Sequence, residues 1–210
     1  MLTTLFHFAA LIGWLLPAAP VDHLEPSAPL DRFEAMYEDL GLEGMMPAEV
    51  FRAAMLRVEA FEGEARVLAI ADMTRPSHEE RLYVIDLVGC QLAKRTWVAH
   101  GQGTGELMAE RFSNRHGSHQ TSLGLYRVGA EILSPKHGPA LLLYGLDPDV
   151  NDQALAREVI MHGADYVSGD FIAQHGRLGR SWGCPAVSRA DMPELIDMLA
   201  DRALLYIHGH

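Results

Sequence analysis

The chain has 210 residues, of which 49% are hydrophobic and 21% charged, and its formal net charge is −11. This length and composition are typical of one folded domain with some decoration, and they exclude an intrinsically disordered protein. Residues 21–80 hold 14 acidic against 5 basic side chains, whereas residues 81–210 hold 14 against 12 with no basic stripe. Nucleic acid is therefore not an expected partner, because binding a phosphate backbone needs clustered Lys and Arg.

The first twenty residues have the pattern of an export signal. An uncharged apolar run from Leu5 to Leu16 is followed by small residues, and it is short for a membrane span. No Lys or Arg precedes this run, so a buried N-terminal helix is the alternative. We expect residues 1–20 to be a signal peptide or N-terminal anchor. The protein would then be exported to the periplasm or cell envelope, with a membrane contact only if the leader is retained.

Residues 21–65 are expected to form a linker and a short, acidic helical extension. The stretch VDHLEPSAPLD, rich in proline and polar residues, is typical of a linker. Apolar residues then recur at helical spacing between positions 33 and 40, and again between positions 50 and 58. Pro47 stands just before the second run, in the first turn of the predicted helix.

From residue 66 onward the sequence changes to short β-rich runs separated by glycine and polar clusters. These runs are ARVLAIADM, RLYVIDLV, RTWVAHG, LGLYRVG, ALLLYGL and REVIMHGADYV. Because no long helices alternate with them, they favour an antiparallel sandwich or barrel over a doubly wound sheet. Ser188 is a candidate cap for a helix with apolar residues at positions 192 to 203, and ALLYIH can form a last strand. We predict a mainly β domain over residues 66–210, with a short N-terminal helical extension and a C-terminal helix.

Cys184 is the candidate nucleophile of the chain. It stands in GRSWGCPAVS, residues 179–188, where two glycines and a proline indicate a tight loop that can present a side chain. Three arginines close in sequence would favour the reactive thiolate: Arg177, Arg180 and Arg189. The second cysteine, Cys90, lies in LVGCQLAK at a predicted strand end, where a cysteine usually behaves as a small hydrophobe.

A thiol nucleophile needs a base within hydrogen-bond reach, and that base is most often histidine. His162 is the best candidate because it ends an apolar strand pattern and is followed by Gly163. His175 is closer to Cys184 in sequence, but it lies in a glycine-rich loop and is less well anchored.

Two structural alternatives remain open at this stage. Export would permit a disulfide between Cys90 and Cys184. A metal site would need ligands from the histidines, but none of them has the paired spacing of zinc motifs, so neither a metal nor a cofactor is expected. The histidines concerned are His100, His116, His119, His137, His162 and His175.

The segment MHGADYVSGDFIAQHGRLGRSWGCPAVS, residues 161–188, resembles the active-site region of the murein L,D-transpeptidases of the YkuD type. The hallmark elements of that family, His-Gly and then Ser/Thr-His-Gly-Cys, correspond to 162–163 and 181–184. The spacer between them is longer by a few residues, Pro185-Ala186 replaces the usual continuation, and Trp182 replaces a histidine. The sequence is therefore similar to a divergent branch with Ser-Trp-Gly-Cys, whose members also carry stretches like those at 112–129 and 144–167. The resemblance covers about residues 66–207.

The resemblance implies a role for each matching residue. Cys184 would attack a peptide carbonyl and His162 would take its proton, with the carbonyl of Gly163 orienting the imidazole. The N–H groups of Gly183 and Cys184 would stabilise the oxyanion. Either Arg177 or Arg180 would bind a substrate carboxylate or else hold the loop. The substrate-binding residues implied by motif position are Arg177, Arg180, Ser181, Trp182, Tyr144 and Asn151, although Tyr144 and Asn151 also fit turn or core roles.

The activity implied is that of a cysteine-dependent L,D-transpeptidase acting on peptidoglycan stem peptides in cell wall biogenesis, without a cofactor. The cysteine would form a thioester with a stem tetrapeptide, release the terminal D-residue and pass the acyl group to an amine. Two alternatives stay open: an L,D-carboxypeptidase or hydrolase on the same peptides, and a noncatalytic cell-wall-binding module.

Overall fold

The computed structural model describes residues 29–210. The predicted export signal at residues 1–20 lies outside the described residues. No helix within residues 29–210 combines the length and apolar character that crossing a membrane requires. The described elements, in chain order, are α1 (Pro29–Asp39), α2 (Ala48–Glu59), β1 (Val67–Asp72), β2 (Leu82–Asp86), β3 (Gln91–Thr96), β4 (Gly124–Ser134), β5 (Gly138–Gly145), β6 (Ile160–Ala164), α3 (Gly169–His175), β7 (Ala186–Ser188), α4 (Met192–Leu199) and β8 (Ala203–His208).

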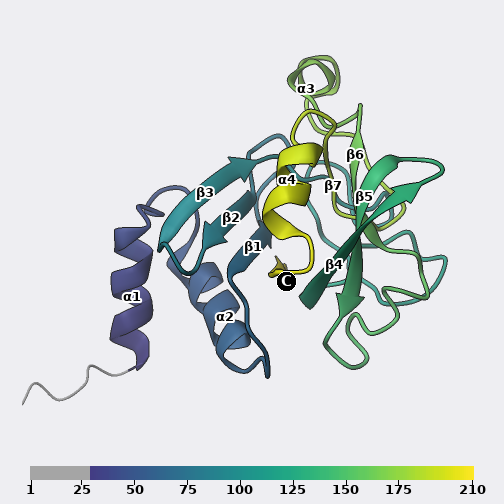
Figure 1. Ribbon diagram of the computed structural model, residues 1–210. Helices are drawn as coiled ribbons and strands as arrows, with labels where there is room; N and C mark the ends of the chain where they lie inside the picture. The colour runs from purple at the N-terminus through teal and green to yellow at the C-terminus, as the bar shows by residue number, and fades with distance from the viewer. Residues whose placement is uncertain (1–28) are drawn as a thin grey trace, which may run out of the picture.

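The eight strands form one sheet in the order β3-β2-β1-β8-β4-β5-β6-β7. Figure 1 shows the sheet curving around α4, with β1, β2 and β3 on one side of this helix and β4 to β7 on the other. The mainly β fold class predicted from the sequence is therefore confirmed. The sheet is not antiparallel throughout, because β1 pairs with β8 and β6 pairs with β7 in parallel.

The sheet is covered on both faces in its β1–β2 half, and the strand sequence explains why. In β1, Ala69 and Ala71 pack in the same core as α4, whereas Leu68 and Ile70 pack with α1 and α2. Side chains alternate between the two faces of a strand, so a continuous apolar run indicates a strand with helices on both sides. Each fully buried leucine such as Leu195 of α4 contributes about 1.5–3 kcal/mol relative to exposure.

The two acidic helices, α1 and α2, pack in the same hydrophobic core as Leu68 and Ile70 of β1. Their apolar faces pack against β1, β2 and β8, so the extension predicted from helical spacing is joined to the β domain. Pro47 is the residue that caps α2, one position before its first helical residue. Figure 1 shows α1 and α2 beside β1 to β3, away from β6 and β7.

Three further segments differ from the sequence expectations. The run RTWVAHG continues as a loop after Thr96 instead of a full strand. α3 forms where a glycine-rich loop was expected, because Ser168 caps its first turn and Gly176, in left-handed conformation, ends it. α4 is capped at Asp191 and not at Ser188, whose hydroxyl hydrogen-bonds to Asp191.

Candidate active site

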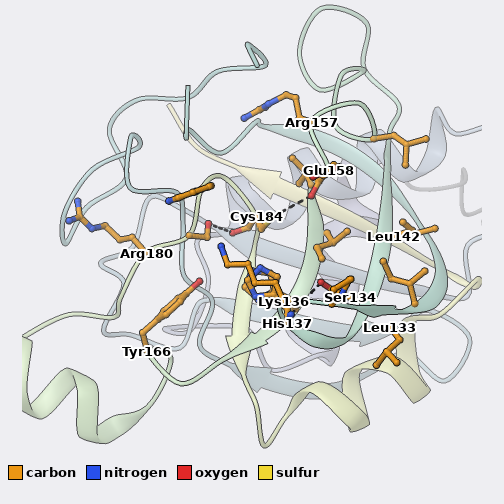
Figure 2. Close-up of a pocket in the computed structure, with 18 residues that line it drawn as sticks. Leu133, Ser134, Lys136, His137, Leu142, Arg157, Glu158, Tyr166, Arg180 and Cys184 are labelled. Carbon is orange, nitrogen blue, oxygen red and sulfur yellow. Dashed lines mark hydrogen bonds between the residues drawn. The ribbon is translucent and has the colours of Figure 1, made fainter. Parts of the chain in front are cut away.

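A pocket of about 760 Å³ opens at the β6–β7 end of the sheet, and both Cys184 and His162 line it. Its walls come from the turn between β4 and β5, from the segment leading into β6, and from the loop before β7. Figure 2 shows Cys184 at the centre, with Arg157 and Glu158 on one side and Lys136 and His137 on the other.

Two adjacent parallel strands bring the candidate nucleophile and base together. His162 on β6 pairs with Ala186 on β7, two residues after Cys184. The His162 N–H also donates to the carbonyl of Pro185 at 3.4 Å. The strand register therefore places Cys184 next to His162, although they lie far apart in the sequence.

The imidazole of His162 is held in one tautomer. Its Nδ1 lies 3.1 Å from the carbonyl oxygen of Gly163. Because a carbonyl only accepts hydrogen bonds, Nδ1 carries the proton and Nε2 remains as the basic nitrogen. Burial lowers the pKa of His162 to about 4 despite this hydrogen bond. His162 is therefore neutral near pH 7.

The thiol of Cys184 is also neutral at rest. Burial raises its pKa above the ordinary value, and the backbone amide of Ile160 and the charge of Arg157 oppose this shift. The thiol donates to the carbonyl oxygen of Glu158 at a sulfur–oxygen distance of 3.8 Å. The pair is thus a thiol beside a neutral imidazole and not a preformed thiolate–imidazolium ion pair.

The arginines closest in sequence do not supply the positive charge near the thiol. Arg177 and Arg180 both pair with Glu106, and Arg189 pairs with Asp165. The cations that lower the pKa of Cys184 are instead Arg157 and Lys136, which the sequence analysis missed. Lys136 stands in no motif, and Arg157 lies in the stretch 144–167, where it was given no role; folding brings them to the pocket from the β4–β5 turn and from the segment before β6.

Ser181 shapes the loop that carries the thiol. Its hydroxyl accepts a hydrogen bond from the Gly183 N–H at 3.0 Å and donates to the Cys184 carbonyl at 2.6 Å. The Gly183 N–H is therefore occupied by the Ser181 hydroxyl, and its role as an oxyanion donor stays a prediction. The Cys184 N–H makes no hydrogen bond to another residue between 29 and 210, so it is the donor available to an oxyanion.

Trp182 forms part of the pocket wall. Its side chain is 64% exposed and stacks on His119, with ring centroids 4.9 Å apart and an interplanar angle of 7°. The Lys136 ammonium lies 4.5 Å from the centroid of the Trp182 ring. Such cation–π contacts contribute about 0.5–1 kcal/mol at exposed sites, so the contact helps to hold the two loops together.

The two candidate carboxylate-binding arginines have different positions. Arg180 lines the pocket and donates to the carbonyl of Gly105 at 3.0 Å and to Glu106 at 2.7 Å. Arg177 does not line the pocket; it donates to the carbonyl of Leu178 at 2.8 Å and pairs with Glu106 at 3.0 Å. Arg177 therefore holds the loop, and only Arg180 is placed to meet a ligand.

Tyr144 and Asn151 do not line the pocket that contains Cys184, so the structure does not bring these two predicted substrate-binding residues to it. Asn151 is buried and donates to the carbonyls of Leu123 and Leu125 while accepting from the Asp147 N–H. The Arg127 guanidinium carbon lies over the Tyr144 ring, 4.2 Å from the centroid of that ring. Both residues stabilise the sheet and its turns.

The rival histidine and the second cysteine lie elsewhere. His175 is exposed at the end of α3 and does not line the pocket. Cys90 is exposed in the turn between β2 and β3 rather than packed at a strand end. Both cysteines are free, so the disulfide alternative is excluded in this structure. Within residues 29–210, no group of three or more His, Cys, Asp or Glu side chains is arranged to hold a metal ion.

The fold and site can now be compared with known proteins. A family model described as the L,D-transpeptidase catalytic domain matches residues 43–208. No curated protein matches the chain. An L,D-transpeptidase from Mycobacterium smegmatis is similar in structure, with 14% identity and a TM-score of 0.43 over 69% of this chain and 59% of that chain. An L,D-transpeptidase from Stackebrandtia nassauensis has 15% identity and a TM-score of 0.39 over 85% of this chain and 76% of that chain. An L,D-transpeptidase from Xylanimonas cellulosilytica has 12% identity and a TM-score of 0.42 over 82% of this chain and 77% of that chain.

This chain spans about three fifths of the length of the Mycobacterium smegmatis chain that it matches. The family match, by contrast, extends over most of the present chain. It includes α2, all eight strands and the whole pocket. The chain therefore belongs to the L,D-transpeptidase catalytic domain family.

Proposed function

We propose that the protein is an exported cysteine L,D-transpeptidase that acylates Cys184 with a peptidoglycan stem tetrapeptide and transfers the acyl group to an amine. The observation that carries this proposal is the pairing of Cys184 with His162 in one pocket, where the Gly163 carbonyl leaves Nε2 as the base. The alternative of a noncatalytic wall-binding module gives no reason for a cysteine and a histidine with a free Nε2 to share a pocket.

The resting protonation states define the first step. Because both partners are neutral, the thiol proton passes to His162 Nε2 as Sγ attacks the peptide carbonyl carbon. The negative charge moves to the carbonyl oxygen, where the free Cys184 N–H can donate to it.

The tetrahedral intermediate then collapses. The carbon–nitrogen bond to the terminal D-residue breaks, and the imidazolium of His162 returns the proton to the leaving amine. The product is a thioester on Cys184 with His162 again neutral. An incoming amine attacks this thioester by the reverse sequence, giving a new amide and the free thiol, whereas water in its place would give hydrolysis.

The pocket has the charge that a stem peptide requires. Stem peptides carry carboxylates, and the pocket is lined by the cations Lys136, Arg157 and Arg180 in a chain whose net charge is −11. Of these, Lys136 is exposed and Arg180 is partly exposed. A guanidinium binds a carboxylate best through two parallel hydrogen bonds, so Arg180 would exchange its contact with Glu106 for the substrate.

The test uses the purified protein with a disaccharide carrying a tetrapeptide stem, with and without an added stem amine. We expect release of the terminal D-residue and, with the amine, a cross-linked product detected by mass spectrometry. The Cys184→Ala variant should form neither, and Cys90→Ser, at the other cysteine, should retain both activities. Release without any cross-link would favour the hydrolase alternative, and full activity in Cys184→Ala would rule out the mechanism.

A further inference from the structure

A second histidine lies directly on the candidate base. His137, in the turn between β4 and β5, stacks on His162 with ring centroids 3.7 Å apart and 27° between the ring planes. Both rings line the pocket that contains Cys184. The contact brings together a turn residue and a buried strand residue from different parts of the sequence.

The backbone at His137 is held independently of this contact. Its N–H donates to the Ser134 hydroxyl at 3.3 Å, and its carbonyl accepts from Arg189 at 3.4 Å. The first bond closes the β4–β5 turn and the second joins the turn to the residue that follows β7. The backbone that carries the His137 ring is therefore held by the fold and not by the contact with His162.

We propose that His137 is a positioning residue for His162: its stacked ring holds the His162 imidazole in the orientation that leaves Nε2 for Cys184, and a proton on His137 would oppose a proton on His162. This inference rests on the proposed function, since it assigns His137 to the same Cys184 and His162 pair. His137 itself makes no contact with the reacting atoms in this account.

The stacked His137 ring restricts the orientation of the His162 imidazole more than the hydrogen bond to Gly163 does alone. The bond from Nδ1 to the Gly163 carbonyl fixes one edge of the His162 ring but permits a swing about that bond. A second ring against one face blocks this swing. The imidazole is then constrained both at an edge and on a face, which is the precision that proton transfer geometry requires.

The groups whose positive charge opposes protonation of His162 are Lys136, Arg189 and, when it is protonated, His137. His137 and Lys136 approach it from the β4–β5 turn, and Arg189 approaches from the loop after β7. On the β6 side, Asp165 is paired with Arg189, and the Cys184 thiol is neutral. A proton on His137 would therefore make protonation of His162 less favourable, so the two rings titrate as a coupled pair.

The imidazolium that forms during acylation meets no second charge on the His137 ring. Burial and the charges of Lys136 and Arg189 lower the pKa of His137, so its ring is neutral near pH 7. The proton that leaves Cys184 then enters a pair of neutral rings. One positive charge forms there, and it is discharged when the leaving amine takes the proton.

Two substitutions separate the two parts of this role. His137→Phe keeps an aromatic ring of similar width on His162 but removes the titrating group, whereas His137→Ala removes both. The rate of Cys184 acylation by a β-lactam at pH 7 should fall roughly ten- to hundredfold in His137→Ala and stay close to the unsubstituted rate in His137→Phe. Thermal unfolding of each variant checks that the fold is intact.

The titration of His162 gives a readout that does not depend on turnover. The imidazole resonance of His162, assigned by its loss in His162→Gln, is followed by NMR against pH in the unsubstituted protein and in His137→Phe. We expect the midpoint to rise by at least about half a pH unit in His137→Phe, because a cation is no longer formed beside the ring.

The two outcomes that would overturn the inference are distinct from failure of the proposed function. An unchanged His162 midpoint in His137→Phe, or an unchanged acylation rate in His137→Ala, would remove His137 from the account. Failure of the unsubstituted protein to be acylated would instead count against the proposed function, while the NMR titration would still test the contact between the two histidines.

Discussion

The hydroxyl of Ser181 accepts a hydrogen bond from the N–H of Gly183 at 3.0 Å. The same hydroxyl donates to the carbonyl of Cys184 at 2.6 Å, so one side chain satisfies two backbone groups of the loop that presents the thiol. The backbone of residues 181–184 is therefore closed into a small ring, and the direction of the Cys184 side chain depends on it.

Removal of this hydroxyl should misplace the nucleophile. In Ser181→Ala the Gly183 N–H and the Cys184 carbonyl lose their partner, and we expect a loss of about 1–3 kcal/mol in the free energy of unfolding. The rate of Cys184 acylation should fall roughly tenfold or more. Urea unfolding and acylation kinetics measure the two effects. Ser181→Thr retains the hydroxyl and is the matched control; equal rates in all three proteins would contradict this role for Ser181.

Gly183 should not tolerate a side chain. Its φ is 121°, and an added Cβ would lie 2.8 Å from the carbonyl oxygen of Gln120. Gly183→Ala should therefore lower the free energy of unfolding by about 2–3 kcal/mol or displace the loop. Gly176→Ala is the control, because Gly176 also has positive φ, 70°, but has open space around its Cα. It should cost only about 1 kcal/mol, and equal losses in the two variants would contradict the close approach.

Buried His100 should make the protein less stable in acid. Its Nδ1 lies 2.7 Å from the Arg81 guanidinium, which only donates, so Nδ1 is an unprotonated acceptor. Burial and the Arg81 charge lower its pKa to about 3. Below pH 6.5 the unfolded chain takes up a proton that the folded chain refuses, so stability is present above pH 6.5 and is lost as the pH falls toward 3.

Urea unfolding between pH 7 and pH 4 measures this loss. His100 should contribute up to about 1.4 kcal/mol per pH unit within the window, and His100→Asn should reduce the slope by about that amount. His116→Asn, at an exposed position, controls for the substitution itself. The same slope in His100→Asn and in the unsubstituted protein would show that His100 does not titrate in this way.

The two cysteines should react differently with iodoacetamide. Cys90 is exposed, whereas Cys184 is only partly exposed and burial raises the pKa of its thiol, so little of it is thiolate at pH 7. We expect Cys90 to be alkylated first, and alkylation of Cys184 to accelerate only as the pH rises above the range in which an ordinary thiol ionises. Peptide mass spectrometry over time resolves the two sites. Rapid alkylation of Cys184 already at pH 5 would instead indicate a preformed thiolate–imidazolium pair.

Much of the fold was predictable because local patterns and tertiary packing agree. The continuous apolar run of β1 and the helical spacing of Val50, Phe51, Ala54 and Met55 in α2 reflect the faces that are buried. β7 was not predicted: it has three residues and exists because Ala186 pairs with both β6 and Ala99. α3 buries no residue, so it lacked the apolar spacing that marks the other helices, although its cap residues Ser168 and Gly176 were present in the sequence.

The site was predictable only in part for a similar reason. Cys184 and His162 stand in local contexts, a glycine-bordered loop and a strand end, that carry a signal in the sequence. The charged residues around the pocket carry no such signal in the sequence, because their effect on the Cys184 thiol depends on distances in the folded structure. Arg177 is near Cys184 in sequence but is paired with Glu106, whereas Lys136 reaches the pocket only because the β4–β5 turn folds over it.

The most direct test of the central claim is mass spectrometry of the intact protein after incubation with a carbapenem. The strained amide of this β-lactam is an acyl donor for a nucleophilic cysteine beside a base, so the account predicts one covalent adduct, mapped to Cys184 and absent from Cys184→Ala. The adduct should form at the same rate in Cys90→Ser. A folded protein that stays unmodified at Cys184, while iodoacetamide still alkylates Cys90, would contradict the assignment of Cys184 as an acyl-accepting nucleophile.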